Sequence, residues 1–227
     1  MIRPDASAAP HGFLGLLGGQ AAEDLTVVGR TRRYRRGATL IGEGTRPDSV
    51  VVLLSGRVKV TSVSGGGDEA LLAVRGPGDL LGELSALDGQ PSSATVSALD
   101  PVEALVVSAA AFRAFLQAHP EAALRLLELL VRRLRDADRK RLEFGAYDTV
   151  GRVASRLVEL SQRFGQPTEH GVRIALPLTQ EELAGWVGSS REAVSKALRW
   201  MRAHGWVETR RKAIVVLDLD ALRRRAT

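Results

Sequence analysis

Residues 178–209, LTQEELAGWVGSSREAVSKALRWMRAHGWVET, form the stretch from which the rest of the chain can be interpreted. Thr179 with Glu182 three residues later is a capping-box pattern, in which hydroxyl and carboxylate satisfy the free N–H groups of a helix start. Gly188 can take the positive φ that ends a helix, and Ser190 is a favourable N-cap for the next one. The stretch predicts two short helices joined by a tight turn, with a strand beyond.

The second predicted helix has one apolar and one polar face. Apolar residues recur at the i, i+3, i+4, i+7 spacing of a buried stripe, namely Val194, Ala197, Leu198 and Met201. The opposite face offers Arg and Lys, which donate to guanine O6 and N7, and Glu, which accepts from cytosine N4. We therefore predict a DNA-reading helix-turn-helix. Two alternatives stay open, a solvated charged face and a helix pair that binds protein.

The residues after this helix predict a wing. Residues 206–209 and 213–217 are short apolar runs of strand type, and residues 172–177 could add a third strand. The cationic residues between the runs 206–209 and 213–217 suit phosphate contact. A charged turn that only improves solubility is the alternative. The full set of predicted DNA-binding residues is Thr179, Gln180, Ser189, Ser190, Arg191, Glu192, Ser195, Lys196, Arg199, Arg210, Arg211 and Lys212.

Charge is unevenly distributed along the 227 residues. Residues 1–120 hold 11 Lys/Arg and 12 Asp/Glu, whereas residues 121–227 hold 21 and 14. The cationic excess coincides with the predicted helix-turn-helix, as an electrostatic footprint for nucleic acid would.

Features that the sequence lacks narrow the class of protein further. The chain has no cysteine, which excludes disulfides, thiol redox sensing and cysteine-ligated iron–sulfur clusters. Residues 1–12 lack the apolar core of a signal peptide, so we expect a disordered tail. No apolar run approaches the ~18 residues of a membrane span. We expect a cytoplasmic protein without membrane contact.

Residues 26–107 predict an all-β unit of the jelly-roll or barrel type, because short β-branched runs alternate with Gly, Pro and Asp. The expected strands are 27–33, 39–41, 49–54, 57–62, 69–74, 94–98 and 102–107. A cupin-type metal enzyme would need histidines in these strands, and the four histidines lie elsewhere. No catalytic triad, P-loop or GxGxxG pattern occurs, so we predict neither an enzyme nor a metal site.

Residues 77–87, PGDLLGELSAL, predict a strand end that runs into a single helical turn. Free backbone N–H groups there could cradle an anion; a helical corner that only closes the barrel is the alternative.

A long helix is predicted from about residue 121 to 144. Its apolar residues alternate gaps of three and four, which is a coiled-coil seam for a homodimer, and they are Leu124, Leu127, Val131 and Leu134. Packing on its own barrel is the alternative. The expected organisation is α+β: a tail at 1–12, a β domain at 13–119, a dimerisation helix at 120–144, a hinge at 145–148 and a winged helix-turn-helix domain at 149–227.

This order of elements resembles the cyclic-AMP receptor protein / fumarate-nitrate reductase regulator (CRP/FNR) family, over about residues 13–222. The matching motifs are DSVVVLLSGRVKV (48–60), GPGDLLGELSAL (76–87), SATV (93–96), VRRL (131–134), GRVASRL (151–157) and LTQEELAGWVGSSREAVSKAL (178–198). The resemblance implies a homodimeric transcription regulator that binds pseudo-palindromic, TGTGA-like double-stranded DNA and contacts RNA polymerase. Of the family's Arg-Glu-x-x-x-Arg reading set, Arg191 and Glu192 match, whereas Lys196 stands at the third position.

The resemblance also implies a cyclic nucleotide-binding-like pocket, from which the chain departs at three ligand-contacting positions. Gly82 and Glu83 match the family's Gly-Glu, but its phosphate-binding Arg-Ser falls on Ser92 and Ser93. Its adenine-contacting pair falls on Ala137 and Asp138. We therefore expect a regulator that does not use cyclic AMP in the usual way, with another nucleotide or small-molecule effector, neutral or cationic, or with none. Arg75 could substitute for the missing arginine. The expected pocket residues are Leu81, Gly82, Glu83, Leu84, Ser92, Ser93, Ala94, Ala137 and Asp138.

Overall fold

The computed structural model describes residues 12–63, 65–67, 69–175, 178–210 and 213–226. The chain divides into two compact units, Met1–Arg135 and Asp136–Thr227, and each is described by itself. The expected tail at 1–12 lies outside the described residues except for its last residue.

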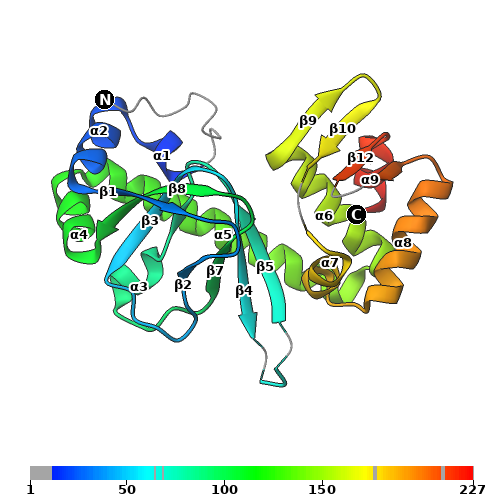
Figure 1. The fold of residues 1–227 in the computed structure, drawn as a ribbon, viewed down its shortest axis with the longest axis horizontal. Helices are drawn as coiled ribbons and strands as arrows, with labels where there is room; N and C mark the ends of the chain where they lie inside the picture. The colour runs from blue at the N-terminus through cyan, green and yellow to red at the C-terminus, as the bar shows by residue number, and fades with distance from the viewer. Residues whose placement is uncertain (1–11, 64, 68, 176–177, 211–212, 227) are drawn as a thin grey trace. The chain divides into compact units, whose positions relative to one another are not determined.

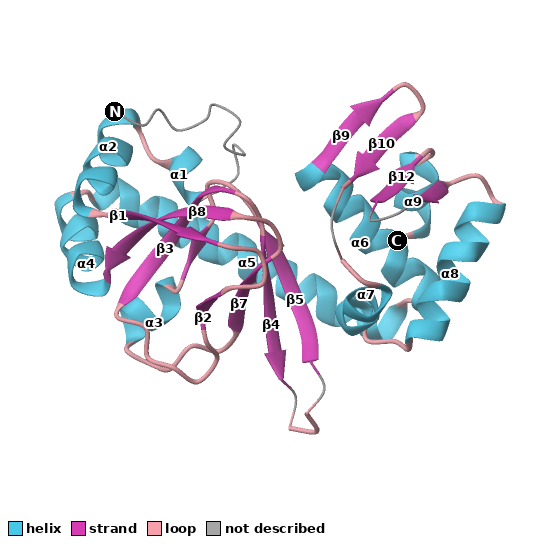
Figure 2. Ribbon diagram, in the orientation of Figure 1, coloured by secondary structure: helices cyan, strands magenta, loops and turns pink. Residues whose placement is uncertain are grey.

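The first unit contains two antiparallel four-stranded sheets (Figures 1 and 2). One has the order β1 (Arg30–Tyr34), β8 (Val102–Ser108), β3 (Ser49–Ser55) and β6 (Leu80–Leu81). The other has the order β2 (Thr39–Ile41), β7 (Thr95–Ala98), β4 (Val58–Val63) and β5 (Glu69–Arg75). This double-sheet arrangement agrees with the jelly-roll prediction.

Strand β3 separates two hydrophobic clusters because its side chains alternate between its faces. Val51 and Leu53 belong to the cluster formed with residues of the second sheet. Val50 and Val52 join a second cluster, which also includes the helix residues Phe112 and Leu126. Both faces of the strand are therefore buried, which explains its continuous VVVLL run.

Helices cover the outer face of the first sheet: α1 (Phe13–Leu16), α2 (Gly19–Val28), α4 (Ala109–Ala118) and the start of α5 (Pro120–Ala146). The prediction of a strand over residues 27–33 was wrong at its start, because α2 continues to Val28 and β1 begins at Arg30. Ala21 and Leu25 are buried one helical turn apart, and this tertiary burial outweighs the β-branched run TVV.

Helix α5 has two apolar faces in the first unit. Ala122, Leu126 and Leu129 are buried in the cluster under the sheet. The predicted seam lies elsewhere on the helix and is exposed, with Leu124 62%, Leu127 57%, Val131 39% and Leu134 62% accessible. The alternative that the seam packs on its own barrel is therefore wrong.

The second unit is a winged helix-turn-helix (Figure 1). Its helices are α6 (Thr149–Phe164), α7 (Gln180–Val187), α8 (Arg191–Ala203) and α9 (Leu219–Arg225). Its sheet has the order β11 (Val207–Arg210), β12 (Ala213–Val216), β10 (Gly171–Ile174) and β9 (Gly165–Thr168). The expected third strand is confirmed as β10, whereas β9 was not predicted.

Candidate DNA-binding and effector sites

The turn between α7 and α8 has the predicted caps. Thr179 N donates to Glu182 Oε2 at 2.7 Å, and Glu182 N donates to Thr179 Oγ1 at 3.1 Å, so the capping box is complete. Gly188 takes the left-handed conformation at φ +57°, and Ser190 Oγ accepts from Ala193 N at 3.2 Å. Both helix starts and the chain reversal are therefore fixed by local hydrogen bonds and backbone freedom.

Helix α8 has a buried apolar face and an exposed polar face, as the sequence predicted. Val194, Ala197, Leu198 and Met201 are buried. Arg191, Glu192, Lys196 and Arg199 are exposed, and Ser195 is half-buried. None of the four exposed charged residues forms a side-chain hydrogen bond or ion pair with another described residue. Their hydrogen-bonding groups are thus free for base edges and phosphates.

Two residues of α6 support the turn and were not predicted. Thr149 Oγ1 lies 3.0 Å from Ser189 Oγ, so this serine has an internal partner. Arg152 Nε donates to the carbonyl of Val187 at 2.7 Å, at the last residue of α7. Sequence alone could not predict these two contacts, because Thr149 and Ser189 are 40 residues apart and Arg152 and Val187 are 35 apart.

At the wing, Arg210 pairs with a neighbour on its own strand. Its Nε and Nη2 donate to the two carboxylate oxygens of Glu208, both at 3.0 Å. This hydrogen bonding lowers the pKa of Glu208 and raises the pKa of Arg210. Arg210 therefore shares its charge with a carboxylate, while the other two predicted wing cations, Arg211 and Lys212, lie outside the described residues.

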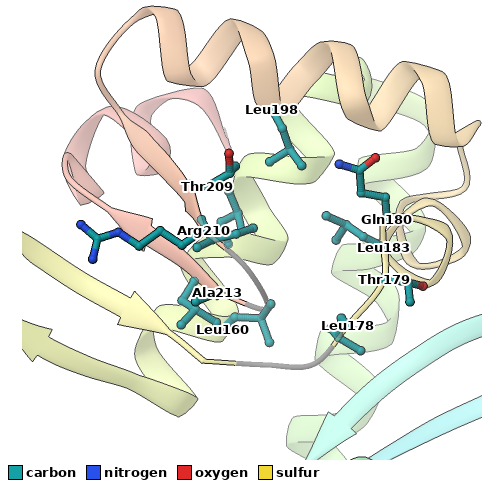
Figure 3. Close-up of a pocket in the computed structure, with 12 residues that line it drawn as sticks. Leu160, Leu178, Thr179, Gln180, Leu183, Leu198, Thr209, Arg210 and Ala213 are labelled. Atoms are coloured by element: carbon teal, nitrogen blue, oxygen red, sulfur yellow. The ribbon is translucent and has the colours of Figure 1, made fainter.

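A cavity of about 140 Å³ lies between the helix-turn-helix and the wing (Figure 3). Its walls are mostly apolar, with Leu160, Leu183 and Leu198 among them. Three predicted DNA-binding residues also line it, namely Thr179, Gln180 and Arg210. These side chains, on two different elements, therefore border one surface depression.

The helical turn of the first unit forms as predicted, as β6 followed by α3 (Glu83–Asp88). Gly82 caps α3 with φ +77°, and a Cβ there would lie 3.1 Å from both Ile41 Cδ1 and the Ser49 carbonyl oxygen. Glycine is needed at this position for its conformation and for the close backbone approach.

Glu83 is buried and has a cationic partner. Arg133 of α5 donates from Nη1 to Glu83 Oε1 at 2.7 Å and from Nη2 to the carbonyl of Leu80 at 2.7 Å. Arg133 therefore compensates the charge of Glu83 within the first unit. Fifty positions separate the two residues, so no local pattern could predict the pair.

Ser92 stands where the resemblance placed an arginine, and its polar groups are bonded to the chain itself. Its hydroxyl donates to the carbonyl of Ala94 at 2.9 Å. Its backbone pairs with the loop after β2 through Gly44 N to Ser92 O at 2.8 Å and Ser92 N to Thr45 O at 2.7 Å. Ser92 supplies no positive charge.

The remaining expected pocket residues differ in their exposure. Leu81 and Ala94 are buried, whereas Leu84 and Ser93 are exposed. Ala137 and Asp138 are exposed residues of the second unit. Arg75, the suggested substitute cation, donates to the carbonyl of its neighbour Val74 at 3.3 Å.

The described residues were also compared with the requirements of a metal site and of a membrane-spanning helix. No group of three or more His, Asp or Glu side chains there could hold a metal ion. None of the helices described combines the length and apolar character that crossing a membrane requires.

Family models match both units. The model of the cyclic nucleotide-binding domain matches residues 31–119, and that of the Crp-like helix-turn-helix domain matches residues 151–225. A CRP-like cAMP-activated global transcriptional regulator of Mycobacterium tuberculosis is 37% identical, over 85% of this chain and 86% of that protein. The chain belongs to the CRP/FNR family. Its relatives are transcription regulators and not enzymes.

Other relatives agree with this placement in the CRP/FNR family. The cAMP-activated global transcriptional regulator CRP of Salmonella typhimurium is 30% identical over 81% of this chain and 88% of its own length. Among solved structures, a CRP-family transcriptional regulator of Thermus thermophilus has a TM-score of 0.73 at 26% identity, covering 86% of this chain and 96% of that chain. FixK2 of Bradyrhizobium japonicum has a TM-score of 0.78 at 22% identity, covering 88% and 98%, and shows the same fold.

Proposed function

We propose that this CRP/FNR regulator is a homodimer that binds pseudo-palindromic DNA with TGTGA-like half-sites and contacts RNA polymerase from there. The observation that carries the proposal is the exposed, unpaired set Arg191, Glu192, Lys196 and Arg199 on one face of α8. Arg and Glu at these positions suit guanine and cytosine readout. Lys196 is a point donor where the family's usual arginine makes a fork, so preference at that base is relaxed.

Fluorescence anisotropy tests the DNA-binding proposal. A duplex with two TGTGA-like half-sites should bind about 10³-fold more tightly than a shuffled duplex of equal length, within the usual range of specificity ratios. Titrations with and without cyclic AMP separate ligand-dependent from constitutive binding. Equal affinity for both duplexes under both conditions would favour a helix-turn-helix that recruits protein.

The exposed seam of α5 supports the dimer. Four large apolar side chains lie at coiled-coil spacing on a surface that the first unit does not cover. Leu127→Lys should shift the sedimentation coefficient from dimer towards monomer, because the substitution places charge in the apolar seam. Val27→Lys is the matched control, since Val27 is 82% exposed and lies on α2, away from the seam. A monomeric wild-type protein would contradict the proposal.

We further propose that the effector, if one acts, is not cyclic AMP bound in the usual way. Ser92 offers no cation to a cyclic phosphate, and Glu83 is paired with Arg133 within the first unit. The alternative is a constitutive regulator, in which the Glu83–Arg133 pair serves only the fold of the first unit. The Mycobacterium tuberculosis relative is described as cAMP-activated, so cyclic AMP is the first ligand to test.

Calorimetric titration with cyclic AMP decides this point. Wild-type protein should show no micromolar binding. Ser92→Arg should raise the affinity roughly tenfold or more, since a hydrogen bond to a charged group contributes about 1.5–3 kcal/mol. Gln90→Arg is the matched control, with the same charge added at an exposed residue outside the expected pocket. Micromolar binding by the wild type at this pocket would overturn the proposal.

A further inference from the structure

The cavity between the helix-turn-helix and the wing is built from the core of the second unit. Its walls come from α6, β10, α7, α8 and the wing strands β11 and β12, all of which lie within residues 136–227. Leu160, Leu183 and Leu198 are 4%, 6% and 6% exposed, so side chains of the packed interior also face this space. The cavity is therefore formed within one unit of the chain.

The walls of the cavity are apolar. Eight of the twelve residues that line it are Leu, Ile or Ala, and Leu183 of α7 and Leu198 of α8 point into the same space (Figure 3). An apolar space of about 140 Å³ is unusual, because packed interiors contain few voids larger than a water molecule. The atoms that line it lack van der Waals contacts on one side. An apolar occupant would restore these contacts.

The chemistry of the walls disfavours water and ions as occupants. A buried water needs two to four polar partners, which the methyl groups of leucine and isoleucine do not provide. Among the described residues that line the cavity, Arg210 is the only charged one. Its guanidinium is bonded to both carboxylate oxygens of Glu208 and points away from Leu183 and Leu198 in Figure 3. The walls therefore favour an uncharged apolar molecule.

Two polar groups at the cavity are available for a hydrogen bond to such a molecule. Gln180 is exposed in the first turn of α7, and its side-chain amide has no hydrogen-bond partner among the described residues. Thr209 Oγ1 accepts from Arg202 Nη1 at 3.2 Å and keeps its own proton to donate. Both residues line the cavity. A single hydroxyl on the occupant would find a donor and an acceptor there.

The volume limits the occupant to about one ring. In another protein, a cavity of about 150 Å³ lined by Leu, Ile and Phe holds benzene. We propose that the cavity here is a ligand site for a small neutral aromatic molecule with one hydroxyl group, a phenol. The ring lies among the leucines of α6, α7 and α8, and the hydroxyl bonds Gln180 and Thr209. This site is separate from the cyclic nucleotide-binding-like pocket, and its existence does not rest on the proposed function.

Methyl NMR spectra of the full-length protein, titrated with phenol, test the site. The methyl resonances of Leu183, Leu198 and Ile214 should shift along one saturable curve, with a dissociation constant on the order of 1 mM or lower, which so small a ligand can reach. Those of Leu25 and Leu105, buried in the first unit, should not shift. Benzoate should bind roughly tenfold more weakly or less, because its charge would be buried without a partner.

Filling the cavity from its wall should remove binding. Ala213 of β12 is 7% exposed and lines the cavity. Ala213→Leu should show no saturable shift at phenol concentrations that saturate the wild type, because the added methyl groups occupy the space of the ring. Ala213→Val adds less volume and should weaken binding less, which covers the case that Ala213→Leu does not fold. Ala203→Leu is the matched control, since Ala203 is exposed on α8 and does not line the cavity.

Three results would overturn the proposal. The first is the absence of saturable phenol binding to the wild type. The second is a set of methyl shifts spread equally over both units. The third is equal phenol binding by the wild type and by a folded Ala213→Leu variant.

The site has a consequence for DNA, and this consequence rests on the proposed function. Gln180 both lines the cavity and is a predicted DNA contact, so an occupant bonded to its amide withdraws it from DNA. Saturating phenol should weaken binding to the TGTGA-like duplex by roughly fivefold or more, and Ala213→Leu should abolish this effect. Unchanged DNA affinity would contradict the consequence. A wild type that selects no duplex would contradict the proposed function alone, since the methyl shifts still decide whether the cavity binds phenol.

Discussion

At the scale of single residues, the exposed face of α8 carries charged side chains that have no hydrogen-bond or ion-pair partner among the described residues. Arg191 and Glu192 are exposed at the start of α8, directly after the Ser190 cap, where the helix end can enter a groove. Their exposure was predictable from the sequence, because helical spacing places them opposite the apolar stripe of α8.

Arg191→Ala should weaken binding to the preferred duplex by roughly 1–3 kcal/mol and relax the preference at one base, because a bidentate base contact is lost. Anisotropy titrations against single-base variants of the site measure this. Arg32→Ala, which removes an equal charge from exposed β1, should change little. An equal loss on every duplex would show that Arg191 contacts phosphate instead.

Asp148 links the end of the chain to the start of α6. Its carboxylate accepts from Gly151 N at 2.8 Å and pairs with Arg225. The backbone hydrogen bond is the larger cause that lowers the pKa of Asp148 below its ordinary 3.8, with Arg225 adding to it. The ionised form is therefore favoured in the folded state, so its stabilisation is complete above pH 3.8 and disappears as pH falls through the lowered value.

Thermal unfolding measured at descending pH tests this linkage. Asp148→Asn keeps an N-cap of similar quality but loses the charge, so its stability deficit should shrink as pH falls below 3.8. Asp220→Asn removes an exposed pair with Arg223 and should alter stability by under about 1 kcal/mol. A deficit that stays constant through the titration would contradict the assigned role of the Asp148 charge.

At the scale of elements, the segments with local signals were predictable and those fixed by tertiary packing were not. The α7–α8 pair has a capping box, a glycine stop and a serine cap, which are all read from adjacent residues. Helix α2 depends on burial of Ala21 and Leu25 against the sheet, and β9 depends on pairing with β10. Such contacts leave little trace in a short window of sequence.

Thr179→Ala should destabilise the second unit by about 1 kcal/mol, because the Glu182 N–H loses its cap acceptor at the start of α7. Chemical denaturation followed by tryptophan fluorescence measures the loss, because all three tryptophans, Trp186, Trp200 and Trp206, lie in the second unit. Thr168→Ala serves as control, since its hydroxyl bonds only the nearby Gly171 carbonyl at the β9–β10 turn. A Thr179→Ala variant as stable as wild type would show that packing alone fixes this helix start.

At the scale of the whole molecule, the order of domains and the family were predictable from motifs spread over the chain. The pairing that gives the expected effector pocket its electrostatics was not, because Glu83 and Arg133 are distant in sequence and no periodicity relates them. The serine at position 92, where the resemblance expects an arginine, was visible in sequence, but the cation that pairs with Glu83 required the structure.

Selection of bound duplexes from a random DNA library tests the central claim most directly. Purified full-length protein, with and without cyclic AMP, should enrich a pseudo-palindrome of TGTGA-like half-sites whose centres are separated by whole helical turns of about 10–10.5 base pairs. The base opposite Lys196 should be the least constrained position of each half-site. Enrichment of no motif under either condition would contradict the account.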